Sequence, residues 1–326
     1  MTRRRWSLTA AVLLLTLTPL AGCVTVHGER ALVPAVTKAE AAKALERFTR
    51  LNNDAKRSYD PAVLAKAETG ALGAMDQAGL TARHTNHPEG NPAAVPLTLT
   101  DARFLIPKQR GWPRWFAADA LSSSAGGSRW LLVFQRAAVS DSWKVSYLAV
   151  VGPGGMPKFT LDHDGYAEPV PLDGSGLLVE PGRLSAAYTS YLQSGTAATL
   201  AFADGTQTSQ VRQQRRKSAG TSAAVTAYAD QPVGAGEFPP VGLRTTDGGA
   251  VVFFASRHQS RLTTPPGKPL KVDDPDTKAL MTGTPKNSVT LVRVAEQAVL
   301  VPPANDAQGK VVFLSRLLGL VSAKGE

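Results

Sequence analysis

The sequence predicts an α+β protein with two tandem domains, each formed by helices followed by a curved antiparallel sheet, behind an N-terminal signal peptide. Three observations support this fold class. Helix-type apolar stripes occur in both halves, β-branched and aromatic runs follow them, and 29 Gly with 23 Pro among 326 residues indicate many turns. We expect a signal peptide at 1–22, a tether at 23–36, and domains at 37–172 and 178–326.

The first segment has the pattern of an export signal. Arg3, Arg4 and Arg5 precede a charge-free apolar stretch at 6–21, which is too short for a hydrocarbon core of about 30 Å. It ends in Leu20-Ala21-Gly22-Cys23, which resembles the bacterial lipobox, whose cysteine receives a diacylglycerol. Because the chain has no other cysteine, this position predicts a lipid on Cys23 and a location on the outer face of the bacterial cell membrane.

Other interpretations of this segment stay open. An ordinary secretory peptide, or a short anchor with an accidental cysteine, is the alternative to lipidation. The arginines followed by Trp6 also resemble a twin-arginine export motif, so export by that route and general secretion both remain possible.

Two helices are expected at the start of the first domain. Residues 24–36 have no clear period and form the expected tether, whereas Thr37 and Glu40 have the spacing of a capping box. Apolar residues then follow at helical spacing, namely Ala41, Ala44, Leu45, Phe48 and Leu51. Asp60 before Pro61 predicts a second, short helix that Gly70 can end.

Strands are expected after Gly79, where prolines become frequent. Residues 97–106 predict one strand region, and 130–134 with 143–150 predict a hairpin whose turn contains 139–142. The first domain is therefore expected to place two helices against an antiparallel sheet.

The second half repeats this order more weakly. Residues 169–174 are a plausible linker, 184–192 carry a helical stripe and 211–217 a helix fragment. Strands are expected at 251–255, 289–294, 299–301 and 311–314. Paired glycines precede an aromatic run in both 126–134 and 248–254, which favours a duplication without proving it.

Composition excludes several classes of chemistry. A single cysteine rules out an internal disulfide and a cysteine-based zinc or iron–sulfur site. Metalloprotease, phosphate-loop, dinucleotide-binding, esterase and penicillin-binding motifs are absent, and no cofactor or metal is expected. Without residues 1–22 the chain keeps 33 basic residues against 26 acidic ones. Outside the membrane, we expect anionic headgroups or cell-wall polymers as partners rather than nucleic acid.

Three polar clusters contain residue types that can bind cations. His84 and His87 precede Pro88 and are interpreted as part of a surface loop, with a metal site as the alternative. Residues 162–165 are interpreted as a polar turn, since a calcium loop needs further acidic positions. Residues 273–276 are interpreted as a solvated turn and helix cap.

Two groups of residues are candidate contact sites. The basic run of Arg212, Arg215, Arg216 and Lys217 is expected to be a solvated helix face or a contact for an anionic surface. The aromatic cluster holding Trp112, Arg114 and Trp115 is expected either to plug the end of the first domain or to line a pocket mouth for a sugar ring or an anionic group.

The chain resembles an uncharacterised family of actinobacterial, Streptomyces-type surface lipoproteins. The lipobox, the helix at 41–51, the stretches 104–107 and 111–116, and the stretch 245–253 carry this resemblance. The layout of each half is also similar to nuclear transport factor 2-like and cystatin-like cones, folds that serve enzymes, binding modules and scaffolds.

The resemblance implies an envelope lipoprotein without assigning it an activity. We expect a non-catalytic binding or interaction module, with a hydrolase or isomerase of envelope material in a cone cavity as one alternative. A structural accessory subunit of an envelope complex is the other alternative. A titratable residue inside a hollow would favour the enzyme.

Overall fold

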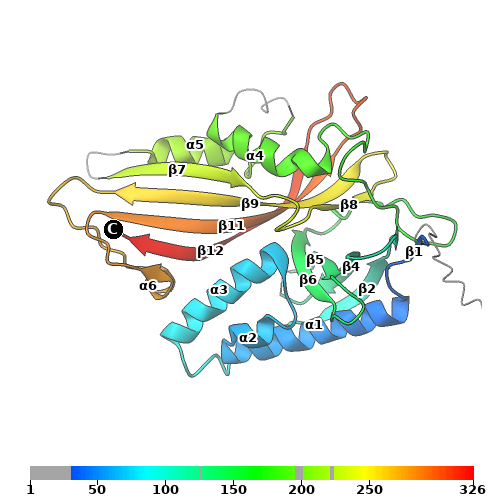
Figure 1. Cartoon of the computed structure of the whole chain (residues 1–326), viewed down its shortest axis with the longest axis horizontal. Helices are drawn as coiled ribbons and strands as arrows, with labels where there is room; N and C mark the ends of the chain where they lie inside the picture. The colour runs from blue at the N-terminus through cyan, green and yellow to red at the C-terminus, as the bar shows by residue number, and fades with distance from the viewer. Residues whose placement is uncertain (1–30, 125, 195–200, 221–223) are drawn as a thin grey trace, which may run out of the picture.

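A computed structural model describes residues 31–124, 126–194, 201–220 and 224–326. It confirms the α+β class: two largely antiparallel sheets lie against each other, and helices cover their outer sides (Figure 1). The predicted signal peptide at 1–22, Cys23 and residues 24–30 of the predicted tether lie outside the described residues. No helix in the described part of the chain is long and apolar enough to span a membrane.

The N-terminal half begins with three helices. α1 (Lys38–Ser58) starts at the predicted capping box, since Thr37 Oγ1 accepts from the Glu40 amide and Glu40 accepts from the Thr37 amide. α2 (Pro61–Leu64) is capped by Asp60 as predicted. α3 (Gly70–Asn86) is not among the helices predicted from the sequence. Gly70, predicted to end the second helix, adopts a φ of 61° and begins α3 instead.

The first sheet has the order β2-β4-β5-β6. Its strands are β2 (Leu99–Leu105), β4 (Arg114–Ser122), β5 (Arg129–Arg136) and β6 (Lys144–Val151). The predicted hairpin is confirmed as β5 and β6, whereas β4 was missed. β1 (Val33–Pro34), inside the segment expected to be a tether, pairs with β3 (Lys108–Gln109).

The second sheet has the order β10-β12-β11-β9-β7, with β8 also paired to β9. Its strands are β7 (Val225–Pro232), β8 (Val241–Arg244), β9 (Ala250–Thr263), β10 (Met281–Thr282), β11 (Ser288–Val301) and β12 (Val312–Gly325). The helical elements of this half are η1 (Pro181–Arg183), α4 (Leu184–Gln193), α5 (Ser209–Ser218) and α6 (Pro275–Ala279). The helices expected at 184–192 and 211–217 are confirmed, and 289–294 and 299–301 belong to one strand.

Helices and sheets from the two halves of the chain pack against each other. α1 packs on one face of the first sheet, while the other face meets the second sheet around Tyr147, Phe253 and Val294. α4 packs on the outer face of the second sheet, and α5 contacts β7. α3, from the N-terminal half, lies under β11 and β12, where Met75 enters the shared core (Figure 1). The core therefore runs through both halves, and self-contained cones stay a prediction.

The free edge of β6 is covered by side chains from the second sheet. The Leu148 amide donates to Glu296 Oε1 at 3.2 Å, and the Val150 amide donates to Ser315 Oγ at 3.1 Å. Because an uncovered strand edge offers unpaired amides to any other strand, these two contacts both dock the sheets and close the edge.

Candidate functional site

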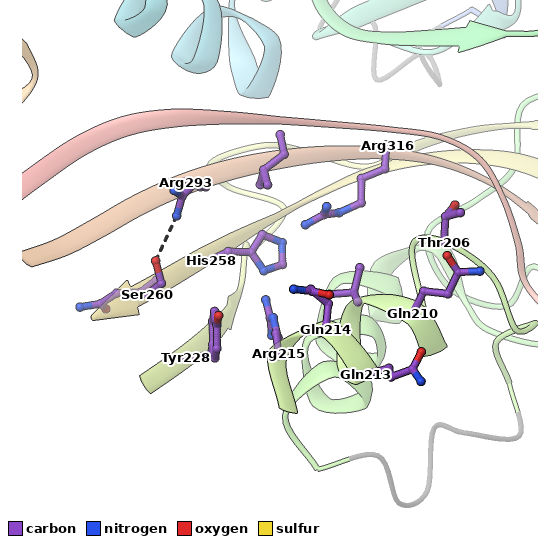
Figure 2. A pocket seen from close by; sticks show the side chains of 13 residues that line it. Thr206, Gln210, Gln213, Gln214, Arg215, Tyr228, His258, Ser260, Arg293 and Arg316 are labelled. Carbon is purple, nitrogen blue, oxygen red and sulfur yellow. Dashed lines mark hydrogen bonds between the residues drawn. The ribbon is translucent and has the colours of Figure 1, made fainter. Parts of the chain in front are cut away.

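A polar cavity of about 620 Å³ lies between α5 and the outer face of the second sheet. Figure 2 shows Gln210, Gln214 and Arg215 of α5 on one side of it, and strand residues on the other. The lining consists of Thr206, Gln210, Val211, Gln213, Gln214, Arg215, Tyr228, His258, Gln259, Ser260, Arg293, Arg316 and Leu318. We call it the α5 cavity.

Strand register brings the charged side chains to one face. His258 stands opposite Arg293 on β11 and opposite Asp230 on β7, so all three point toward α5. Arg316 of β12 stands opposite Gln297 of β11. Gln297 follows Arg293 by four residues, so Arg316 lies on the same face of the sheet as Arg293. Residues separated by up to about 100 positions in the chain therefore meet in one cavity.

A buried hydrogen-bond relay lies behind the α5 cavity and reaches its lining through His258 and Arg215. Gln297 Nε2 donates to Ser256 Oγ at 2.8 Å, and Ser256 Oγ lies 2.9 Å from His258 Nε2. His258 Nδ1 lies 2.5 Å from Asp230 Oδ1, and Arg215 binds both oxygens of Asp230 at 2.5 and 2.8 Å. The relay fixes the Arg215 guanidinium and the imidazole in place.

The environment sets the charges of this relay. Burial lowers the pKa of His258, despite the opposing hydrogen bond to Asp230, so the ring is neutral at neutral pH. Burial alone would raise the pKa of Asp230, but the hydrogen bonds from His258 and Arg215 outweigh it and hold that pKa below its usual value. Asp230 is therefore a carboxylate, and its charge balances that of Arg215.

Two further guanidiniums in the α5 cavity have no such balance. Arg293 donates to Ser260 Oγ at 3.0 Å, and Arg316 has a buried Nε without a hydrogen-bond partner (Figure 2). Neither forms an ion pair with a carboxylate anywhere in the described ranges. Burial lowers the pKa of both, yet an arginine stays charged at neutral pH. The cavity therefore carries uncompensated positive charge.

The order Asp230, His258, Ser256 is that of a hydrolase triad, and the geometry argues against that role. Ser256 is 0% exposed and does not line the cavity. Both ring nitrogens of His258 are occupied within the relay, so neither faces a substrate. The relay is suited to holding Arg215 rather than to attacking a bound molecule.

The predicted basic run divides between this cavity and the surface. Arg215 turns inward to Asp230, and Arg212 lies 5.1 Å from the centre of the Tyr191 ring. Arg216 and Lys217 are exposed. A smaller hollow of about 300 Å³ on the other side of Arg215 contains Arg212, Arg216 and Asp230.

The Trp112 cluster lies elsewhere, at the rim of the first sheet. Trp112 stacks against Arg114 at 4.9 Å, while Trp115 is half-buried and packs in the core shared by the two sheets. Arg114 and Trp115 line a proline-rich cleft of about 350 Å³. Trp112, Arg114 and Trp115 are thus well separated from the α5 cavity along the fold.

The three polar clusters considered as cation sites, at 84–87, 162–165 and 273–276, belong to the end of α3, a turn and the start of α6. The loop predicted for His84 is wrong, because α3 continues through it to Asn86 and His87 follows as its cap. The turn at 162–165 is confirmed by Asp162 Oδ1, which accepts from the amides of Asp164 and Tyr166. The cap at Asp274 is confirmed at the start of α6. Within the described residues no group of three His, Cys, Asp or Glu side chains could hold a metal ion.

Sequence reasoning missed the strand residues that line the α5 cavity, His258, Ser260, Arg293 and Arg316, and the buried relay partners behind them, Asp230 and Ser256. The available signal was the polar alternation of Ser256, His258 and Ser260 within an otherwise apolar strand. Polar residues on the covered face of a strand point to a lined hollow or a buried network.

The fold and this cavity define the protein as an α+β protein with an arginine-lined hollow against the outer face of its second sheet. The chain belongs to the family described as "Domain of unknown function (DUF8094)", whose model matches residues 32–325. The expected family resemblance is thereby confirmed.

Relatives carry the word lipoprotein in their names. The chain is 47% identical over 320 residues to "Uncharacterized lipoprotein SCO2278" of Streptomyces coelicolor, covering 98% of this chain and 94% of that protein. It is 46% identical to an "Uncharacterized lipoprotein" of Streptomyces avermitilis, over 98% and 94% of the two chains. A second S. coelicolor protein, "Uncharacterized lipoprotein SCO6871", is 28% identical over 317 residues, which cover 89% of this chain and 82% of that protein. No solved structure matches the chain.

Proposed function

We propose that this protein is a lipid-anchored, extracytoplasmic binding protein that takes a small anionic ligand into the α5 cavity without transforming it. The lipobox at Cys23 and the names of the relatives support the anchor. The observation that carries the binding role is the pair Arg293 and Arg316, two partly buried guanidiniums without a carboxylate partner in the described chain, of which Arg316 has a buried Nε with no hydrogen-bond partner.

Unbalanced buried charge is costly to a folded protein. A buried cation loses its hydration and is normally paired with a carboxylate, as Arg215 is with Asp230. An anion that enters the α5 cavity would supply the missing partner for Arg293 and Arg316. This cost explains why such an arrangement suits a ligand site rather than a purely structural core.

The rest of the lining indicates the chemistry of the ligand. Amides and hydroxyls of Gln210, Gln214, Gln259 and Thr206 can donate to and accept from ligand hydroxyls. A volume of about 620 Å³ fits a small organic molecule. We infer a ligand with a phosphate or carboxylate group joined to a hydroxyl-rich body, such as a phosphorylated sugar.

Titration calorimetry tests this proposal. The ligands are inorganic phosphate and glucose 6-phosphate, and glucose is the uncharged control. Arg316→Met is expected to weaken binding of the two anions by about tenfold or more, since a charge-assisted hydrogen bond is lost. Lys271→Ala, at an exposed site far from the cavity, is the control. Equal affinity of both variants for the anions would contradict the proposal.

The same variant has a second readout. Without ligand, Arg316→Met is expected to raise the melting temperature, because methionine removes an unpaired buried charge while it keeps most of the side-chain volume. If Arg316 instead served the fold, the variant would be destabilised.

The anchor is tested separately. Cys23→Ser is expected to leave an uncleaved precursor, because the thiol that accepts the diacylglycerol is missing. Normal processing and unchanged membrane association of this variant would show that the lipid assignment is wrong.

A further inference from the structure

A second cationic hollow lies in the N-terminal half, beside the turn between β5 and β6. Its volume is about 810 Å³, and its basic side chains are Arg47, Lys66, Arg136 and Lys144. We call it the arginine–tryptophan cleft, because Arg136 lies between the rings of Trp112 and Trp143, at 4.8 Å from each ring centre.

Backbone carbonyls and aromatic rings hold these cations in place. Arg47 donates to the Lys66 carbonyl at 2.9 Å, and Lys144 Nζ donates to the Ala65 carbonyl at 2.8 Å. Arg136 is fixed by its two indoles, and its Nε has no hydrogen-bond partner. Carbonyls and rings orient a cation without cancelling its charge.

Acidic neighbours do not neutralise the cleft. Asp141 lines it, but its carboxylate accepts from the Ala138 amide. Glu40 lies within electrostatic range of Arg136 and is engaged in the cap of α1. Among the described residues, none of the four basic side chains forms an ion pair with a carboxylate. Four cations therefore face one lining carboxylate.

The cleft is connected to the place where the tether enters the fold. Arg114 stacks on the ring of Trp112 and also donates to the Pro34 carbonyl at 3.3 Å, so β1 adjoins the stack. Eight residue steps separate Cys23 from residue 31, and an extended chain of that length spans at most about 29 Å. A lipid on Cys23 would therefore keep this side of the molecule close to the bilayer.

The turn beside the cleft has the composition of a membrane contact. Val139, in the β5–β6 turn, is 73% exposed and lies between Arg136 and Lys144 in the chain. Trp112 is half-buried, and Lys66 is exposed. An exposed apolar residue flanked by cations, with a tryptophan nearby, is typical of a surface that meets the headgroup layer.

We propose that the arginine–tryptophan cleft and the β5–β6 turn rest on anionic phospholipid headgroups of the bilayer that carries the anchor. This inference uses the lipid at Cys23 from the proposed function to set the distance. The phosphates of the headgroups pair with Arg136, Lys66 and Lys144, and Val139 enters the interface. The lipid on Cys23 and the arginine–tryptophan cleft then attach the molecule to the membrane at two points, which together set its orientation relative to the bilayer.

Vesicle co-sedimentation of the chain from Cys23 to Glu326, produced without its leader so that Cys23 carries no lipid, tests the proposal. This chain holds every described residue. It is expected to bind phosphatidylglycerol vesicles and not phosphatidylcholine vesicles, with an affinity that falls as salt increases. Each cation near an anionic surface contributes a factor of about five, so Lys66→Glu is expected to weaken binding by about tenfold or more.

Lys217→Glu, which makes the same charge change on exposed α5, is the matched control and is expected to bind as the parent does. Val139→Asp, in an exposed turn, should weaken binding without lowering the melting temperature. Equal losses for Lys66→Glu and Lys217→Glu would show attraction by net charge alone and overturn the proposal. Binding to phosphatidylcholine, or full competition by free inorganic phosphate, would overturn it too.

The outcomes are separable from those of the proposed function. Cys23 carries no lipid in this assay, so a failure to bind vesicles would not bear on lipidation. Lipidation is measured separately, by whether the Cys23→Ser variant accumulates as an uncleaved precursor. Anion binding in the α5 cavity is measured in solution without vesicles, on residues of the other half of the chain.

Discussion

Glu296 is a carboxyl group held almost entirely away from water. It is 1% exposed, its Oε1 accepts from the Leu148 amide, and its Oε2 has no partner. Burial raises the pKa of Glu296 well above its usual value, and the nearby Asp76 and Glu68 add to the shift. The folded protein therefore keeps this group protonated at a pH where the unfolded chain has already lost the proton.

This difference predicts a stability that falls with pH. Above the ordinary glutamate pKa the unfolded state ionises and the folded state does not, so the free energy of unfolding decreases by up to about 1.4 kcal/mol per pH unit, until the raised pKa is reached. Glu296→Gln keeps an acceptor for Leu148 and should flatten the decline. Urea unfolding at pH 5 and pH 8 measures it, with exposed Glu46→Gln as control. An unchanged slope in Glu296→Gln would contradict the prediction.

Local signals explain which single residues were predicted. Thr37, Glu40, Asp60 and Asp274 act on amides two or three positions away, so their roles were visible in the sequence. The α5 cavity depends on side chains from β7, β9, β11 and β12, and their meeting follows from strand register across long intervals. Periodicity within one segment contains no such information.

The missed helix α3 shows the same limit for a whole element. Gly70, Gly73 and Gly79, with the polar end at 84–86, give it a weak helical signal. Tertiary contacts with β6, β11 and β12 stabilise it instead. β4 could not be predicted from periodicity, because the strand is buried on both faces and lacks the alternation of apolar and polar residues that identifies a half-exposed strand.

The contact between α3 and β12 predicts opposite effects for two glycines. A Cβ on Gly319 of β12 would lie 2.6 Å from the Met75 Cβ, so Gly319→Ala must push α3 away and should cost about 1–3 kcal/mol. A Cβ on Gly79 of α3 meets nothing within 4 Å, and Gly79→Ala should stabilise the helix by up to about 1 kcal/mol. Chemical unfolding of both variants measures the two signs. A neutral Gly319→Ala would mean that the elements are not in this close contact.

At the scale of the whole molecule, the shared core makes a prediction about the boundary expected between 172 and 178. The Leu178 amide donates to the Pro302 carbonyl and the Ala304 amide to the Gly176 carbonyl, so this segment is bonded to the loop between β11 and β12. If a protease cuts there, the two pieces are expected to stay together, because α3 and the first sheet contribute to one apolar core with β9 and β11.

Limited proteolysis followed by gel filtration without denaturant measures this. One peak that holds both pieces, with two bands on a denaturing gel, is the expected result. Two separate peaks, each unfolding with its own transition, would instead support two independent cones.

The covering of β6 has a consequence for the life of the chain before it is folded. The Leu148 and Val150 amides find their acceptors on Glu296 and Ser315, which are synthesised 148 and 165 residues later. Until those residues are synthesised, the edge of β6 is uncovered, and its amides can pair with strands of other incompletely folded chains. Aggregation through this edge therefore competes with folding until the C-terminal strands are present.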